Sequence, residues 1–309
     1  MKNMRIPLII AWGVAVIGII LGSFLDLQIS SAIASPSNGF GLTISAIGPT
    51  IGFGAVAVMG GGFIVLIRKG DYHILLKILF GVLAAACFGV AIFYPAGEWF
   101  GVNGFDGAAP GWVGYIIAFF PASGALVGGY FLFRDYQNKN IWIVFCSIIV
   151  LLLIALLAVI PTLKDSIHRP RYRYVVSGEL VEFHRWWQPF KEYKEYISSE
   201  GHPVFVGLKE ITKDEFKSYP SGHTAEASIL FVGVTFLPLV HTKFKKYQMP
   251  LFYGACGLVV LVAFARILVG AHYLSDVSTG ATVILTLLII ANEVIMRIKP
   301  LQLEEKVEE

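Results

Sequence analysis

The sequence contains few charged residues for its length. Only 15% of its 309 residues are charged, whereas 56% are hydrophobic, and a soluble domain of this size carries about a quarter charged residues. The apolar residues gather in long runs, which indicates a membrane protein and argues against a soluble domain. The formal net charge of +3 is too small to indicate a nucleic-acid partner.

Cysteine is also scarce. Cys87, Cys146 and Cys256 lie far apart, each inside an apolar run, and the sequence has no CxxC. This pattern argues against a disulfide framework and against a cysteine metal site, so we interpret the three residues as small buried hydrophobes. The sequence also lacks the period-2 alternation of barrel strands and shows no evident internal repeat.

Eight apolar runs predict the fold class, an all-α polytopic transmembrane helix bundle. Each run is close to the ~20 residues that a helix needs to cross the hydrocarbon, where unpaired backbone groups are not tolerated. The first run follows Lys2 and Arg5 and resembles a signal peptide, but its length favours a retained helix. The predicted spans are roughly 7–25, 46–67, 74–95, 111–133, 141–161, 222–240, 250–268 and 275–296.

The placement of lysine and arginine predicts the orientation. Segments 26–45 and 96–110 contain neither residue, whereas the alternate connections and both terminal segments are basic. Short basic segments stay in the cytoplasm. We therefore predict a protein of the cell membrane with cytoplasmic termini, an outward loop 162–221 and a charged cytoplasmic tail 297–309.

The loop 162–221 is the only sizeable polar segment. Phe190, Tyr193 and Ile197 form a helical apolar stripe in it, just after Trp186 and Trp187. Amphipathic aromatic segments favour the membrane–water interface. The alternative is a small packed cap without lipid contact.

A turn and a helix start meet where this loop ends. Pro220 and Gly222 indicate the turn, and the free backbone N–H groups of a helix that starts at Ser221 form an anion pocket. His223 adds a side chain that carries a proton near neutral pH. Taken alone, the segment is equally compatible with an ordinary capped helix start.

Two further polar clusters lie at predicted outward boundaries. His272 and Asp276 are four residues apart, and a carboxylate bonded to one ring nitrogen leaves the other as a nucleophile. The alternative is a helix cap with a structural hydrogen bond. Arg266 ends an apolar run, where an arginine is costly unless it is paired or reaches the headgroups. Lys164 and Arg171 supply cations suited to phosphate, or a basic loop that touches lipid headgroups.

Together the three clusters resemble the type-2 phosphatidic acid phosphatases, which are membrane lipid phosphate phosphatases. The family pattern is Lys, six residues, Arg-Pro; then Pro-Ser-Gly-His; then Ser-Arg, five residues, His, three residues, Asp. The resemblance covers about residues 141–296. The matching positions are Lys164 and Arg171, then Pro220, Ser221, Gly222 and His223, then Arg266, His272 and Asp276.

The sequence departs from the pattern at two places. Tyr172 follows Arg171 where the family has proline, so the pair Arg169-Pro170 offers a competing register. Ala265 replaces the serine before Arg266. Because the family core usually has six helices, the resemblance implies a catalytic region 141–296 and an N-terminal region 1–140 in which two of about four helices are additional.

The resemblance implies a mechanism. His272 attacks the phosphorus of a lipid phosphate or pyrophosphate at the outer membrane face, Asp276 orients His272, and His223 protonates the leaving oxygen. Water then cleaves the phosphohistidine. No cofactor or metal is implied, because cationic side chains stabilise the negative charge on the phosphoryl oxygens. The phosphate-binding residues implied are Lys164, Arg171, Ser221, Gly222 and Arg266.

Three residues near these clusters have alternative interpretations. His168 is a possible substrate contact, but a solvated loop histidine is the simpler interpretation. Arg169 is a possible substrate contact or, in the competing register, the arginine of the first motif. Glu226, one turn beyond His223, either tunes that histidine or bonds a neighbouring helix.

Other functions remain to be weighed against a lipid phosphatase. A phosphoryl or headgroup transferase would use the same site. A transporter is disfavoured because the ionisable groups gather at one face and not at the midplane, and a non-catalytic lipid-binding relative because all the implied catalytic side chains are present. The membrane spans argue against a soluble vanadate-type haloperoxidase. The expected partners are a lipid phosphate and membrane lipids; the identity of the lipid and the oligomeric state stay open.

Overall fold

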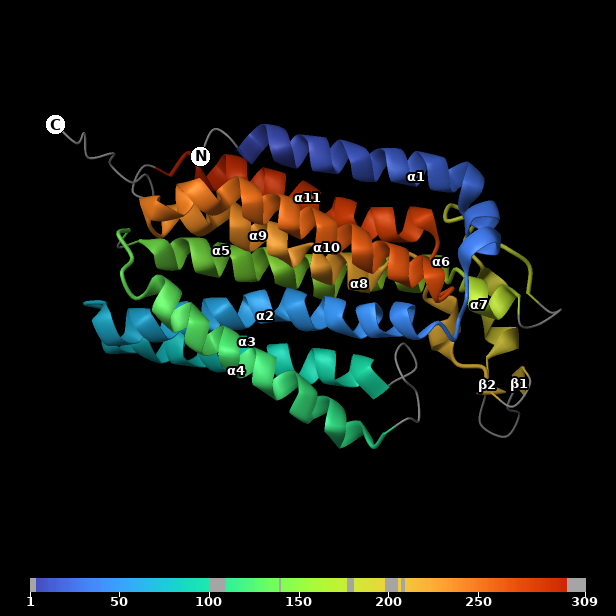
Figure 1. Cartoon of the computed structure of the whole chain (residues 1–309), viewed down its shortest axis with the longest axis horizontal. Helices are drawn as coiled ribbons and strands as arrows, with labels where there is room; N and C mark the ends of the chain where they lie inside the picture. Colours follow the sequence, from blue (N-terminus) through green and yellow to red (C-terminus); the bar gives the residue numbers. More distant parts are fainter. Residues whose placement is uncertain are drawn as a thin grey trace.

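The computed structural model describes residues 4–100, 109–138, 140–176, 181–197, 205–206 and 209–298. Within them, long helices run side by side as a bundle (Figure 1). Eight helical stretches of the described residues are long and apolar enough to cross a membrane. The predicted all-α, polytopic bundle is therefore confirmed, and the chain is a multi-pass membrane protein.

Four long helices make up most of the described residues in the first part of the chain. They are α1 (Arg5–Ile33), α2 (Gly39–Lys69), α3 (Ile74–Phe100) and α4 (Gly111–Phe133). Helix α2 begins about two turns before the predicted span, because the Asn38 side chain caps it by accepting a hydrogen bond from the Gly41 N–H at 3.0 Å. Its first two turns include Gly39, Gly41, Thr43 and Ser45, which is why hydrophobicity alone missed them.

The fifth predicted span extends beyond the predicted end at residue 161. Helix α5 (Ile141–Leu153) continues through the π-helix η2 (Ile154–Val159) into α6 (Ile160–Ile167). The left-handed backbone of His168, with φ 50°, ends α6. Lys164 therefore lies on a helix and not on a loop.

The polar loop folds into a small cap at one end of the bundle. It contains α7 (Tyr172–Val175), the 3₁₀ helices η3 (Lys191–Tyr196) and η4 (Lys213–Phe216), and an antiparallel pair of β1 (Phe205–Val206) with β2 (Lys209–Glu210). The predicted stripe lies in a 3₁₀ helix and its flanks, and it faces inward. The cap core consists of buried Tyr174, Val181, Phe190, Tyr193, Ile211 and Phe216. The packed-cap alternative describes this stripe better than the lipid-contact reading.

The last part of the chain holds a broken span and two long helices. The sixth span comprises α8 (Gly222–Ala227), α9 (Ile229–Phe236) and the 3₁₀ helix η5 (Leu237–Leu239). After η6 (Thr242–Tyr247), the long helices are α10 (Gln248–Leu268) and α11 (Leu274–Ile295). The break between α8 and α9 lies at Ser228. The Ser228 hydroxyl donates to the Thr224 carbonyl at 2.7 Å and so competes with the regular helical pattern.

Helix α8 lies at the centre of the bundle, between α2, α10 and α11. Two glycines allow its backbone to come close. A Cβ atom at Gly52 of α2 would lie 2.2 Å from the Glu226 carbonyl oxygen, and one at Gly280 of α11 would lie 2.3 Å from the Ser221 carbonyl oxygen. Neither position accepts a larger side chain without moving α8, so these contacts fix the helix that begins at Gly222.

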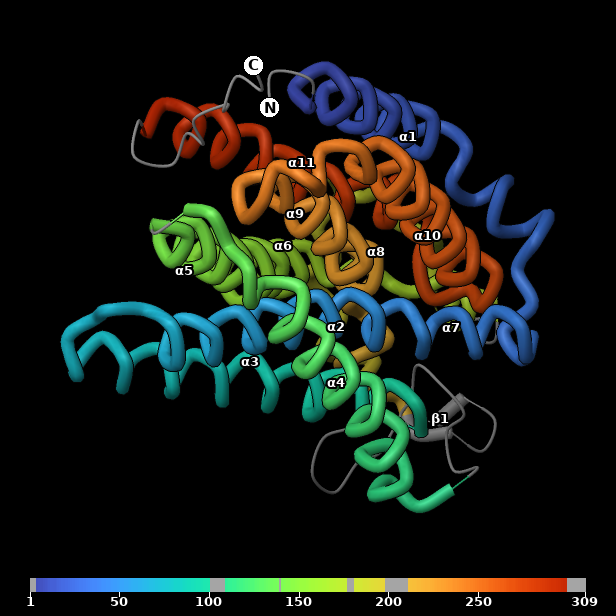
Figure 2. The backbone as a smooth tube through the Cα atoms, turned by 60° about the vertical axis from the view of Figure 1, so that its left-hand side comes forward, coloured from blue at the N-terminus to red at the C-terminus, as the bar shows by residue number. Residues whose placement is uncertain are grey.

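The remaining N-terminal helices pack in two places. Helix α1 packs along α11, whereas α3 and α4 pack on each other and on α2 (Figure 2). The start of α1 and the end of α11 lie at the opposite end of the bundle from the cap (Figure 1). We take α3 and α4 as candidates for the two additional helices, since they form an outer layer on α2.

Candidate active site

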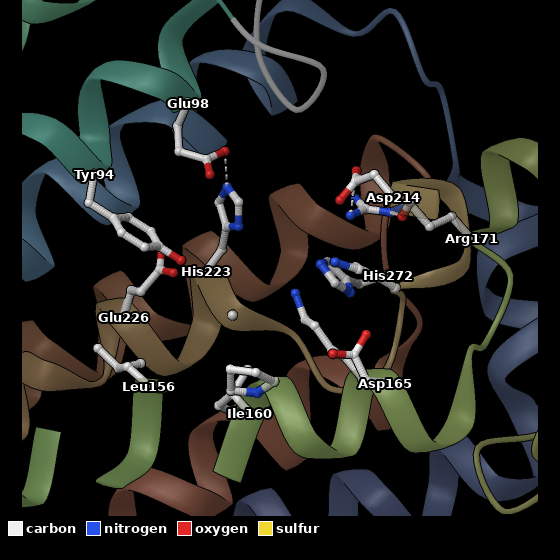
Figure 3. Close-up of a pocket in the computed structure, with 14 residues that line it drawn as sticks. Tyr94, Glu98, Leu156, Ile160, Asp165, Arg171, Asp214, His223, Glu226 and His272 are labelled. Atoms are coloured by element: carbon white, nitrogen blue, oxygen red, sulfur yellow. Dashed lines mark hydrogen bonds and ion pairs between the residues drawn. The ribbon is translucent and has the colours of Figure 1, made fainter. Parts of the chain in front are cut away.

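A cavity of about 250 Å³ lies at the cap end of the bundle. Its walls come from the end of α3, from η2 and α6, from the cap, from the start of α8 and from the turn between α10 and α11 (Figure 3). The lining residues are Tyr94, Glu98, Leu156, Ile160, Pro161, Lys164, Asp165, Arg171, Asp214, Lys217, Gly222, His223, Glu226 and His272.

All three predicted clusters contribute to this cavity. Lys164 and Arg171 come from the first cluster, Gly222 and His223 from the second, and His272 from the third. These residues are separated by up to about a hundred positions in the chain, so the fold, and not local sequence, brings them together. Lysine and arginine beside two histidines form a site suited to a phosphoryl group.

Three predicted residues lie behind the cavity wall. Ser221, Arg266 and Asp276 are fully buried and are not among its lining residues. The Ser221 hydroxyl oxygen caps α8 by accepting from the Thr224 N–H at 3.4 Å and from the Thr224 hydroxyl at 3.2 Å. The helix-cap reading therefore holds for Ser221, while its neighbours Gly222 and His223 face the cavity.

His272 is oriented by a backbone carbonyl. Its Nδ1 lies 2.6 Å from the Ser218 carbonyl oxygen, and because a carbonyl only accepts, Nδ1 bears the proton and Nε2 keeps its lone pair. Asp276 Oδ2 lies 3.8 Å from Nδ1, which is too long for a hydrogen bond. The expected direct bond from the Asp276 carboxylate to the ring is thus replaced by the Ser218 carbonyl.

Asp276 acts on the turn that holds His272. Its Oδ2 accepts from the Ser218 hydroxyl at 2.5 Å and from the Tyr273 N–H at 2.9 Å. Burial lowers the pKa of His272 well below its ordinary value, and the nearby Asp276 carboxylate opposes this only in part. The imidazole is therefore neutral at pH 7, as a nucleophile requires.

The two arginines of the first cluster have different surroundings. Arg171 lines the cavity, and its Nη2 lies 2.8 Å from Asp214 Oδ2. Arg169 is fully buried away from the cavity, with Nη1 2.6 Å from Asp276 Oδ1 and Nη2 2.9 Å from Asp26 Oδ2. The spacing that selects Arg171 agrees with this geometry, and Arg169 does not contact the cavity as a possible substrate ligand would.

Backbone hydrogen bonds fix the segment that carries these arginines. The Arg171 N–H donates to the Glu215 carbonyl at 2.9 Å, and the Ser218 N–H donates to the Arg169 carbonyl at 3.0 Å. On the other side, the Arg173 N–H donates to the Gly270 carbonyl at 2.9 Å. The segment is therefore held between the end of the cap and the turn before His272. His168, in contrast, stacks on Tyr193 with ring centroids 3.7 Å apart and does not line the cavity.

Sequence reasoning did not assign Asp214 to the site. Burial alone would raise the pKa of Asp214, but the positive charges of Arg171 and Lys164 outweigh it and hold the pKa at about 2. The carboxylate is consequently ionised at every physiological pH and forms an ion pair with the Arg171 guanidinium. Nothing in its local sequence distinguishes Asp214 from the other acidic residues of the loop.

Two residues of α3 were also missed. Tyr94 and Glu98 line the cavity from the N-terminal region, and Glu98 Oε2 lies 3.0 Å from His223 Nε2 (Figure 3). Tyr94 faces Glu226, the acidic residue of α8 (Figure 3). An acidic residue close to the end of an apolar run is a signal that could have indicated Glu98.

A family model described as the PAP2 superfamily matches residues 141–299. The match covers 159 of the 309 residues, so the chain belongs to this superfamily, and the resemblance noted in the sequence is confirmed. No curated protein and no solved structure matches the chain. Superfamily membership and eight apolar helices together support a membrane phosphatase. Glu98, Tyr94 and Asp26 lie outside the matched region.

Proposed function

We propose that this membrane phosphatase hydrolyses a lipid phosphate or lipid pyrophosphate through a phosphohistidine intermediate, without a metal ion. The observation that supports the proposal most is the convergence of Lys164, Arg171, Gly222, His223 and His272 on one cavity. The cavity also has an apolar wall, which suits a lipid next to its phosphate. Leu156, Ile160 and Pro161 of the fifth span form that wall.

In the first step, His272 Nε2 attacks the phosphorus and the bond from phosphorus to the leaving oxygen breaks. The Ser218 carbonyl keeps the proton on His272 Nδ1, so the lone pair of Nε2 is available throughout. His223 gives a proton to the leaving oxygen, which departs as an alcohol or, from a pyrophosphate, as a phosphate. Lys164 and Arg171 stabilise the charge on the phosphoryl oxygens, with Arg266 buried behind them.

In the second step, a water molecule attacks the phosphorus of the phosphohistidine. His223, now neutral, takes a proton from the water, and the electron pair of the broken P–N bond returns to His272 Nε2. Inorganic phosphate leaves and both histidines regain their starting states. Positioned proton transfer of this kind contributes about 10²–10⁴-fold to the rate.

A panel of lipid phosphates tests the reaction and the substrate together. We expect the purified protein in detergent to release phosphate from at least one of a phosphatidic acid, a phosphatidylglycerol phosphate, a sphingoid phosphate and a polyprenyl pyrophosphate. An acceptor alcohol added to the same assay distinguishes hydrolysis from group transfer. Absence of phosphate release from the whole panel would contradict the proposed function.

Two inhibitors test the chemistry. Activity should persist in a metal chelator, because the cationic side chains provide the positive charge. Orthovanadate should inhibit, because it adopts the five-coordinate geometry of phosphorus under attack. Complete loss in chelator that a divalent ion restores would contradict the metal-free step.

We also propose that the cap and the cavity face outward in the cell membrane. Cysteine introduced at Arg185 of the cap should react with a membrane-impermeant thiol reagent on intact cells, whereas cysteine at Lys243 should react only after permeabilisation. Both side chains are exposed. The reverse labelling pattern would contradict the proposed topology.

A further inference from the structure

The contact between Glu98 and His223 joins two different parts of the chain. His223 belongs to the region that the superfamily model matches, whereas Glu98 lies in α3, before that region. Glu98 Oε2 and His223 Nε2 are 3.0 Å apart, and the side chains are only 18% and 7% exposed. An ionised carboxylate at this distance from a ring nitrogen stabilises the protonated ring by its charge.

Close packing holds the end of α3 in place. The Tyr94 ring packs on Phe53 of α2 with centroids 4.6 Å apart. A Cβ atom at Gly114 of α4 would lie 2.3 Å from the Ala96 carbonyl oxygen, so α4 approaches the α3 backbone directly. Both contacts are made by residues of α3 that lie within about one turn of Glu98. They hold this end of α3 against α2 and α4 and so position Glu98.

Other charged groups surround His223. Lys164 comes from α6, Arg266 from α10, and Glu226 from the next turn of α8 itself. Glu226 faces Tyr94, while Glu98 faces the His223 ring (Figure 3). Burial and these two cations disfavour a protonated imidazole, and the Glu98 carboxylate opposes both effects at the ring.

We propose that Glu98 is the positioning residue of the proton donor: its carboxylate pairs with the Nε2 side of His223 and stabilises the protonated ring, so that the Nδ1–H is presented to the leaving oxygen. This inference rests on the proposed phosphatase function. It also gives α3, a candidate additional helix, a direct part in the reaction.

The proton transfers balance in this arrangement. As the P–O bond breaks, the electron pair goes to the leaving oxygen, which takes the proton from His223 Nδ1. The His223 ring becomes neutral and keeps its Nε2 proton, which faces Glu98. In the second step Nδ1 accepts a proton from the attacking water, and the imidazolium with its Glu98 partner is restored.

The test compares substrates that differ in their need for a proton donor. An alkyl phosphate releases an alkoxide unless it is protonated, whereas 4-nitrophenyl phosphate releases a stable phenolate. We expect Glu98→Gln to lower kcat/KM for the alkyl phosphate about 10–100-fold. For 4-nitrophenyl phosphate, kcat/KM, which reports only the steps up to departure of the leaving group and not the second step, should stay within about 3-fold of the unmodified protein.

Three comparisons complete the experiment. Glu98→Asp keeps the charge and should recover part of the alkyl phosphate rate. Glu293→Gln is the matched control, since Glu293 pairs with Arg5 at 3.4 Å near the other end of the bundle, and it should leave both rates unchanged. His223→Ala should show the same substrate dependence as Glu98→Gln, and the double variant should lose little more than His223→Ala alone.

The possible results separate the inference from the proposed function. Equal loss on both substrates, or no loss on either, would overturn the role of Glu98 while leaving the phosphatase intact. Additive losses in the double variant would also overturn it, because Glu98 would then act independently of His223. If the unmodified protein releases phosphate from neither substrate nor any lipid of the panel, the proposed function itself fails.

Discussion

The two histidines of the cavity have unlike surroundings. His272 lies in a turn fixed by the Asp276 carboxylate, which also accepts from Arg169, and Arg169 in turn contacts Asp26 of α1. His223 meets Glu98 at the edge of the cavity, from α3. Under the proposed mechanism the nucleophile must keep one orientation, whereas the donor must gain and lose a proton. The rigid network and the single facing carboxylate suit these two needs.

The largest effect should come from the histidines themselves. We expect His272→Ala to lower kcat at least about 10⁴-fold on alkyl and aryl phosphates alike, since no nucleophile remains. His223→Ala should lower kcat/KM, which reports only the first step, about 10²–10⁴-fold on the alkyl phosphate and far less on the aryl phosphate. Phosphate release from both variants provides the measurement.

His241→Gln is the matched control for these variants. His241 lies in the connection between η5 and η6, where its Nδ1 accepts from the Lys243 N–H at 3.1 Å, and it does not line the cavity. Its replacement should leave kcat unchanged. If His272→Ala and His223→Ala had the same substrate dependence, the contrast between nucleophile and donor would be lost.

The buried network around Arg169 should matter more for stability than for substrate binding. Arg169→Met leaves the Asp26 and Asp276 carboxylates buried without their cation, both side chains being 2% exposed or less. Removing one partner of such a pair costs about 3–5 kcal/mol. The temperature of half-unfolding in detergent should therefore fall by several degrees.

Arg173→Met is the comparison for this effect. Arg173 pairs with Glu215 at 3.0 Å, but the two side chains are more exposed, at 14% and 8%. Its loss should lower the half-unfolding temperature less than Arg169→Met does. Equal or reversed effects would show that the Asp26–Arg169–Asp276 network does not hold the His272 turn.

The smallest predicted effect concerns Asp214, whose Oδ2 lies 2.8 Å from Arg171 Nη2. We expect Asp214→Asn to lower the inhibition constant of vanadate about 2–5-fold. Arg171 then binds the incoming oxyanion without first giving up an ionised carboxylate partner. With a pKa of about 2, below the ordinary 3.8, the carboxylate stays ionised above pH 4 and is neutralised only as the pH falls toward 2. The tightening should therefore be the same at pH 5.5 and pH 8. A tightening that disappears at pH 5.5 would contradict an ionised Asp214.

Motifs and apolar runs predicted much of the molecule because both are local in the chain. The eight spans follow from length and hydrophobicity, and Lys164, Gly222, His223 and His272 follow from the three clusters. What the sequence could not indicate are contacts between helices. Glu98 reaches His223 only because α3 packs on α2, which in turn packs on α8.

Other differences have equally physical causes. Ser218 orients His272 through a backbone carbonyl, and since every residue has a carbonyl, no pattern marks this one. The stripe at Phe190 and Tyr193 has helical spacing, but the cap core buries it in a 3₁₀ helix. Spacing favoured Arg171 but left Arg169 as a competing register, and the contact of Arg169 with Asp26 of α1 became visible only in the fold.

The most direct test of the central claim is to trap the intermediate. A ³²P-labelled lipid phosphate that the enzyme turns over should leave an acid-labile, base-stable label on the protein after a rapid quench, and peptide mapping should locate it at His272. His272→Ala should remain unlabelled, whereas His223→Ala, which lacks the proposed base for the second step, should retain the label longer. Label at any other residue, or turnover with a labelled His272→Ala protein, would contradict the account.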